Sequence, residues 1–182
     1  NTTSGTLTDC GRRITAIAAK LMRRLGASST DLKPRGVYDE TLIIFCSDHG
    51  EQHGNNGFRG RRGPYDGNFH VRDPCEAADS MRGSRVNAFT EHVDLLPTIL
   101  DALQLENTDA IDGRSLVPFL HGTPPSAWRD AAHFAYDFRD LVGKSVETTL
   151  GLASNECHFR AIRGKRWEYV EFPTLPPLLF DM

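Results

Sequence analysis

The sequence predicts an α/β fold with a small C-terminal subdomain, and three segments support this prediction. Residues 42–46 form a short apolar run without polar alternation, which is typical of a strand buried on both faces of a parallel sheet. Residues 14–25 carry apolar side chains at helical spacing, so helix and strand fit one arm of an α/β crossover unit. Residues 161–170 read as an antiparallel hairpin with a Gly-containing turn. We therefore expect an α/β core in residues 1–125 and a subdomain with antiparallel strands in residues 126–182.

The first expected helix has clear ends. Its apolar stripe consists of Ile14, Ile17, Ala18, Leu21 and Leu25. Thr8 or Asp9 can cap its N-terminus, and Gly26 can end it. A polar linker over residues 27–36 then leads to the apolar strand.

A long loop is expected after that strand. Residues 50–67 are rich in Gly, Asn and Arg and show no periodicity, and loops of this length in compact domains are usually functional or disordered. Helical spacing returns in residues 93–103, where Val93, Leu96, Leu100 and Leu103 form a stripe. Pro97 lies near the first turn of this helix, where a missing amide hydrogen costs little.

The sequence pattern changes in the C-terminal segments. Residues 112–115 turn the chain into the apolar residues 116–120, and the Gly- and Pro-containing residues 122–125 mark a subdomain boundary. Phe134, Tyr136 and Phe138 alternate as in a half-buried strand, for which core packing is the expected role. Residues 178–180 form one more short apolar segment.

Composition narrows the classes of partner. With 39% hydrophobic and 25% charged residues the chain resembles ordinary soluble globular proteins, and its formal charge of −3 gives no reason to expect nucleic acid or an acidic membrane as partner. No apolar run is long enough to span a bilayer, and the polar start has no signal peptide, so we expect a cytoplasmic protein. The four cysteines are scattered without a CxxC pair, which favours reduced thiols over a disulfide framework.

Asp48 and His49 follow the apolar run directly and form the candidate metal site. Functional groups of open α/β sheets gather beyond the carboxyl ends of their strands, and a carboxylate beside an imidazole suits a divalent cation. Gly50 lets the backbone turn sharply and leaves the space above the site clear. The alternative is a capped strand end with Asp48 turning the chain and His49 on the surface. Two ligands cannot complete a coordination sphere, so other ligands have to come from elsewhere.

The Arg-rich loop behind this pair suggests an anion site. Arg59, Arg61 and Arg62 could grip a phosphate or sulfate in forked hydrogen bonds, or they could form a solvated basic loop. His53, His70 and His92 are further candidates, although a single histidine is more often structural or exposed. Asp94 and Asp101 lie in the helical stretch and are expected to be a cap and part of a solvated face.

A family resemblance extends these local interpretations. Residues 38–52, which read YDETLIIFCSDHGEQ, resemble the second metal-binding motif of the sulfatases, and within them the bacterial phosphonate monoester hydrolases and arylsulfatases of the alkaline phosphatase superfamily. The similarity continues, in family order, through the motifs GPYD, RDP, VDLLPTILD, DGRSL, YDFR and PPLLFD. It covers nearly the whole chain from Leu7 on. The resemblance implies part of an alkaline-phosphatase-like mixed sheet flanked by helices.

The resemblance also implies a chemistry. Such enzymes hydrolyse small sulfate or phosphonate and phosphate esters with an oxidised cysteine as nucleophile and a divalent metal ion (Mn, Ca, Mg or Zn) that activates it. Asp48 and His49 correspond to two metal ligands. Arg61 stands where many relatives have a lysine that binds the substrate oxyanion, so it keeps the charge but not the same reach. Large assemblies occur in the family, so a homo-oligomer is one expectation.

The departures from the family pattern concern the nucleophile and the remaining ligands. None of the four cysteines lies in the family's Cys-x-Pro-Ser-Arg motif, and the N-terminal Asp-Asp ligands are missing. We therefore expect the C-terminal part of a sulfatase-like hydrolase that is inactive as this chain alone. The alternative is a non-catalytic remnant or interaction module that retains a weak metal or anion site. A phosphatase or phosphomutase relative with a Ser or Thr nucleophile fits residues 128–182 less well.

Overall fold

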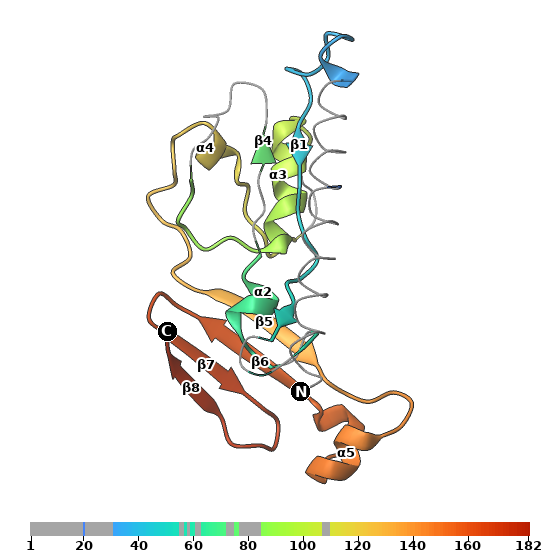
Figure 1. Ribbon diagram of the computed structural model, residues 1–182. Coiled ribbons are helices and arrows are strands. Elements are labelled where there is room, and N and C mark those ends of the chain that lie inside the picture. Colours follow the sequence, from blue (N-terminus) through green and yellow to red (C-terminus); the bar gives the residue numbers. More distant parts are fainter. Residues whose placement is uncertain are drawn as a thin grey trace. The chain divides into compact units, whose positions relative to one another are not determined.

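The chain forms two compact units. The computed structural model describes residue 20 and residues 31–54, 57, 59–60, 63–71, 75–76, 85–106 and 110–182. Unit 1 comprises residues 1–82 with 120–122, and unit 2 comprises residues 83–119 with 123–182 (Figure 1). The expected boundary at residue 125 stays a prediction. Among the described residues, no helix has the length and apolar character needed to cross a bilayer.

The elements in the described part of unit 1 are short. Strand β1 (Ile43–Ile44) pairs with β4 (Cys75–Glu76), and β2 (Gln52–His53) pairs with β3 (Arg59–Gly60), both in antiparallel register. Helix α2 (Asp66–Phe69) is a single turn. The expected loop over residues 50–67 therefore contains a short hairpin and the start of a helical turn.

The strand expected at residues 42–46 differs from its prediction. Only Ile43 and Ile44 are in strand conformation, both are half-buried, and the partner β4 runs antiparallel. An apolar run reports burial but carries no information on the direction of a neighbouring strand, which is set by where the chain returns. The helix expected at residues 14–25 lies outside the described residues, apart from Lys20.

The helix expected at residues 93–103 is confirmed in unit 2. A 3-10 turn, η2 (His92–Asp94), leads into α3 (Leu95–Ala102), and the short α4 (Val117–Leu120) follows. The expected apolar stripe is largely exposed, with relative accessibilities of 47% for Val93, 52% for Leu96 and 58% for Leu103. The spacing predicted the helix correctly, but the described residues of this chain do not cover its apolar face.

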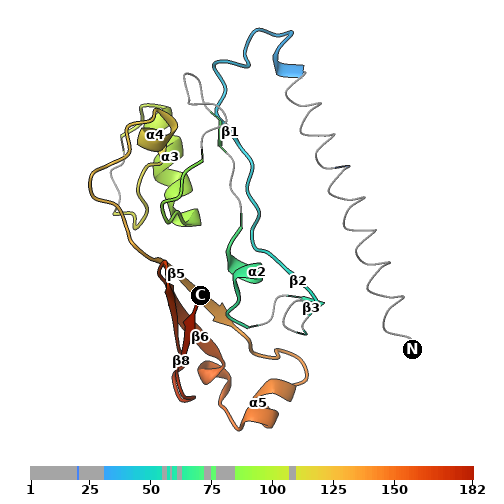
Figure 2. The same ribbon diagram turned by 60° about the vertical axis from the view of Figure 1, so that its left-hand side comes forward.

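A four-stranded antiparallel sheet forms the rest of unit 2. Its order is β5 (Ala132–Asp137), β6 (His158–Arg163), β7 (Trp167–Glu171) and β8 (Leu178–Asp181). Figures 1 and 2 show these strands side by side, with α5 (Ser145–Leu150) beyond the end where β5 stops. The turn η3 (Ser154–Glu156) leads from α5 back to β6. The predicted hairpin and the antiparallel C-terminal strands are confirmed.

The core of unit 2 lies on one face of this sheet. Phe159, Ala161 and Val170 are at most 5% exposed. Four aromatic rings surround Phe159 with centroid separations of 5.8–6.4 Å: Phe134, Tyr136, Phe138 and Phe172. The packing role expected for the alternating aromatic residues of β5 is therefore confirmed.

Candidate metal centre

Asp48 and His49 lie four and five residues beyond the end of β1, and their side chains turn toward each other. The backbone amide of His49 donates to Asp48 Oδ1 at 2.9 Å, which holds the carboxylate over the peptide. The second oxygen, Asp48 Oδ2, lies 3.5 Å from His49 Nε2. The Ser47 hydroxyl donates to the His49 carbonyl at 2.8 Å and tightens the same turn. The side chains of Asp48 and His49 are therefore positioned relative to each other by local hydrogen bonds.

The hydrogen bonding of the His49 ring defines its neutral tautomer. Nδ1 lies 2.7 Å from the Gly50 carbonyl oxygen. Because a carbonyl can only accept, Nδ1 must carry the proton, and Nε2 of the neutral ring then presents a lone pair. A metal-binding histidine usually donates its other ring N–H to a carbonyl or carboxylate in this way.

The donor pair fits a divalent cation. Two ligand atoms about 2.1 Å from one ion stand roughly 3.0–3.4 Å apart in octahedral or tetrahedral geometry, close to the Nε2–Oδ2 separation of 3.5 Å. Both side chains are accessible, at 34% for His49 and 86% for Asp48, so an ion can reach them. In the part of the chain that the structure describes, no cluster of three or more His, Cys, Asp or Glu could hold a metal. Within the described residues the pair therefore offers two donor atoms of the four to six that such an ion needs.

The predicted anion-binding residues are only partly visible. Arg61 and Arg62 lie outside the described residues, so the role of Arg61 stays a prediction. Arg59 and His53 belong to the paired strands β3 and β2, of which the backbone is described. His70 ends α2 and is exposed. His70 does not join Asp48 and His49 in a cluster of three potential ligands among the described residues.

Asp94 has a structural role that the sequence only partly indicated. It accepts from the Glu91 amide at 2.9 Å in the capping box of η2, but as the N-cap residue of α3 it makes no side-chain cap hydrogen bond, and it is fully buried. Arg129 binds both its carboxylate oxygens, and the Arg114 amide donates to Oδ1 at 2.9 Å. Asp101 is exposed, as expected, and accepts from the Ser115 hydroxyl. His92 is exposed as well.

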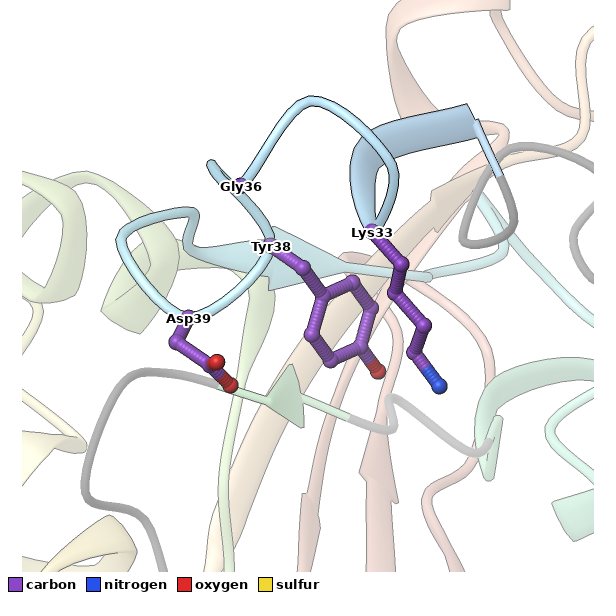
Figure 3. Close-up of a pocket in the computed structure, with 4 residues that line it drawn as sticks. All are labelled: Lys33, Gly36, Tyr38 and Asp39. Atoms are coloured by element: carbon purple, nitrogen blue, oxygen red, sulfur yellow. The ribbon is translucent and has the colours of Figure 1, made fainter.

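A pocket in unit 1 lies at the residues that precede β1. Lys33, Gly36, Tyr38 and Asp39 line it, and Figure 3 shows the side chains of Lys33 and Tyr38 alongside each other. Lys33 Nζ lies 4.8 Å from the centroid of the Tyr38 ring, in a cation–π contact. Neither Asp48 nor His49 lines this pocket, which is therefore separate from the candidate metal site.

Comparison with known proteins identifies the family. Residues 26–105 match the sulfatase family model, and these residues include Asp48 and His49. The multifunctional alkaline phosphatase superfamily protein PehA of Trinickia caryophylli is 39% identical over 87% of this chain. The chain thus matches the sulfatase family over residues 26–105 and is similar to members of that family over most of its length. It spans 31% of that relative's length, so it corresponds to about a third of a whole enzyme of this kind.

Solved structures agree with this assignment. The phosphonate monoester hydrolase of Agrobacterium radiobacter is 42% identical, with a TM-score of 0.83 over 90% of this chain and 33% of that one. The phosphonate monoester hydrolase of Silicibacter pomeroyi is 38% identical, with a TM-score of 0.82 over 86% of this chain and 31% of that one. The predicted α/β class and the alkaline-phosphatase-like sulfatase fold are therefore confirmed, as is the resemblance of this chain to part of such enzymes.

Proposed function

We propose that this chain supplies part of the catalytic centre of a metal-dependent hydrolase that cleaves sulfate or phosphonate and phosphate monoesters of small molecules. The observation that supports it most is the pairing of Asp48 Oδ2 with His49 Nε2 at 3.5 Å, in a neutral tautomer suited to a cation. Asp48 and His49 hold the ion, which is Mn, Ca, Mg or Zn. When bound, the ion activates the nucleophile and neutralises charge on the transferred group.

Arg61 has a separate role in this proposal. Its guanidinium binds oxygens of the sulfuryl or phosphoryl group and balances their negative charge. A planar guanidinium donates two parallel hydrogen bonds, whereas a lysine acts as a point charge, so the position favours a fixed orientation of the ester. Its side chain acts on substrate and not on the ion.

The 182-residue chain by itself is proposed to be inactive. It contains no Cys-x-Pro-Ser-Arg motif for the nucleophile and no Asp-Asp pair for the remaining ligands. Removing a nucleophile costs several orders of magnitude in rate. Incubation with an aryl sulfate and a phosphonate monoester, with added Mn²⁺ or Ca²⁺, tests this. Turnover near that of a complete relative would contradict it.

A chimera tests the function itself. This chain replaces the corresponding third of the Agrobacterium radiobacter phosphonate monoester hydrolase, which supplies the rest of the centre. We expect the chimera to hydrolyse a phosphonate monoester, and Asp48→Ala or His49→Ala to lower kcat/KM at least about a hundredfold. His121→Ala, at an exposed histidine outside the site, is the matched control and should leave the rate unchanged.

The second candidate is a non-catalytic remnant that binds a metal ion or an anion. The incomplete ligand set among the described residues favours it. It predicts that the chain binds Mn²⁺ weakly through Asp48 and His49 while the folded chimera shows no turnover. A chimera whose activity depends on Asp48 would exclude it.

Assembly and location are further proposals. A homo-oligomer is consistent with the exposed apolar row on the outer face of the sheet, where Ile162 and Tyr169 are each 40% exposed and Leu179 is 63% exposed. Size-exclusion chromatography with light scattering tests self-association, and a monomer at high concentration would contradict it. The expected cytoplasmic location is tested by fractionating cells that express the protein.

A further inference from the structure

Gly50 connects the metal-binding pair to helix α2. Its carbonyl oxygen accepts from His49 Nδ1 at 2.7 Å, and its amide donates to the Asn68 carbonyl oxygen at 2.7 Å. The first bond orients the ring of the candidate ligand, and the second ties the same residue to the α2 turn. The ring of His49 is therefore linked to Asn68 through the two polar groups of one glycine.

Close backbone packing reinforces this link. A Cβ atom on Gly50 would lie 2.2 Å from the Gly67 carbonyl oxygen and 3.0 Å from its carbon, far inside van der Waals contact. Both atoms belong to backbone, so neither can rotate away as the end of a side chain could. Gly50 is required here because of this contact and not because of its own backbone angles, which lie outside the left-handed region.

Asn68 holds the other side of the contact in place. It is fully buried, its Nδ2 donates to the Gly63 carbonyl at 2.9 Å, and its backbone amide donates to the Tyr65 carbonyl at 2.8 Å. The side chain and the backbone together close the turn of residues 63–68. Truncating Asn68 would leave the Gly63 carbonyl without this donor and loosen the turn that contacts Gly50.

We propose that Asn68 is a positioning residue which, through Gly50, keeps His49 in its Nδ1–H tautomer with Nε2 directed toward Asp48. The inference rests on the proposed metal-binding function but concerns a different part of the molecule. A ligand is most effective when a hydrogen bond on its far side fixes ring orientation and proton position before the ion arrives. Asn68 would not touch the ion or the ester. It would act by reducing the number of ring orientations available to His49.

The experiment reads the ring nitrogens of His49 directly. In the ¹⁵N-histidine-labelled 182-residue chain near pH 8, two-bond ¹H–¹⁵N spectra distinguish Nδ1–H from Nε2–H. The chain has seven histidines, so a His49→Gln variant assigns the signals. We expect a predominantly Nδ1–H ring, and on addition of Zn²⁺ alone we expect the His49 Nε2 signal to shift while Nδ1 keeps its proton.

Three variants connect the ring to the contact. Gly50→Ala and Asn68→Ala should each mix the two tautomers and weaken Zn²⁺ binding at His49 about ten- to a hundredfold, as loss of an outer partner of a metal ligand usually does. Gly164→Ala is the matched control, because a Cβ there meets only one ordinary contact at 3.6 Å. It should change neither quantity. The dispersion of amide chemical shifts in the NMR spectrum of each variant shows whether that variant is folded. The tautomer of His49 in the wild-type chain tests the inference independently of the variants.

The outcomes separate the two proposals. An Nε2–H ring in the wild type, or folded Gly50→Ala and Asn68→Ala chains with unchanged tautomer and Zn²⁺ affinity, would overturn the positioning role. An Nδ1–H ring that depends on Gly50 and Asn68 as expected would support it. If such a ring showed no Nε2 shift at millimolar Zn²⁺, metal binding by this pair in the 182-residue chain would be overturned, while the link from Asn68 through Gly50 to the ring would stand.

Discussion

Arg129 binds the buried carboxylate of Asp94 with both terminal nitrogens, at 2.5 Å from Nη1 to Oδ2 and 2.6 Å from Nη2 to Oδ1. The residues are 35 positions apart, so the pair joins the start of α3 to the segment before β5. The carboxylate holds the pKa of Arg129 above its ordinary value through this side-chain hydrogen bond. Asp94 also receives two backbone amides, so removing the arginine would leave a fully buried charge without its counter-charge.

The first prediction concerns this pair. Arg129→Ala should lower the free energy of unfolding of unit 2 by about 3–5 kcal/mol. The reason is that the buried carboxylate of Asp94 loses the guanidinium that binds both of its oxygens. Arg129→Lys should restore part of the lost stability, because the ammonium keeps the positive charge. It should not restore all of it, since an ammonium cannot form the two parallel hydrogen bonds of a guanidinium. Urea unfolding monitored by tryptophan fluorescence measures it. Arg139→Ala, which breaks the exposed pair with Asp137, is the control and should change stability little.

A second prediction concerns an ion pair in the C-terminal sheet whose carboxylate is buried and whose arginine is half-buried. Glu168 is 1% exposed and its Oε2 lies 3.6 Å from Arg163 Nε. Arg163→Met should destabilise unit 2 by about 3 kcal/mol, because it leaves the buried carboxylate without this cation. The double variant Arg163→Met/Glu168→Leu should be no less stable than the wild type, since an apolar pair avoids the desolvation of both charges. A double variant as unstable as the single one, in thermal unfolding, would contradict this.

Acid should loosen the loop before α5. Asp140 accepts hydrogen bonds from the Ser145 hydroxyl at 2.6 Å and from the amides of Gly143 and Ser145 at 3.0 Å, which hold its pKa well below the ordinary value. A depressed carboxyl pKa means that the stabilisation is complete above the unfolded-state value near 4 and declines as the pH falls below it.

The measurement follows the loop amides. The protection factors of the Gly143 and Ser145 amides, which are corrected for the intrinsic exchange rate at each pH, should be high at neutral pH and decrease as the pH falls below about 4. Asp140→Asn should remove this pH dependence, because the amide side chain does not titrate. Protection factors at these two amides that decrease equally with acid in the variant would argue against Asp140 as the source.

The thiols of Cys157 and Cys46 should react at different rates. Cys157 is 1% exposed, and burial together with the nearby carboxylate of Glu147 raises the pKa of its thiol. Because the thiolate is the reactive form, Cys157 should resist alkylation in the folded chain. Cys46 is exposed and should react with iodoacetamide first. Peptide mass spectrometry against time checks the order, and equal labelling in denaturant is the control.

Much of the C-terminal sheet was predictable from local patterns. The alternation of Phe134 and Tyr136 predicts a strand with one buried face, and the polar turn between residues 163 and 167 predicts a hairpin. Both features could be predicted because they depend only on near neighbours in the sequence. The same holds for α3, whose spacing predicts a helix whatever lies against it. The exposure of Leu96 and Leu103 could not be predicted in this way, since burial depends on which other segments are present.

The sequence by itself determined the candidate ligands, because Asp48, His49 and Gly50 are consecutive and the chemistry of a carboxylate beside an imidazole is local. Only the tertiary structure decided what supports them. The antiparallel return of β4 and the contact of Asn68 with Gly50 both depend on segments brought together by folding, and so does the burial of Asp94 under Arg129. A hydrogen bond across 18 or 35 residues leaves no periodic trace in the sequence. The ligand types could therefore be predicted from the sequence, and the positioning of their side chains could not.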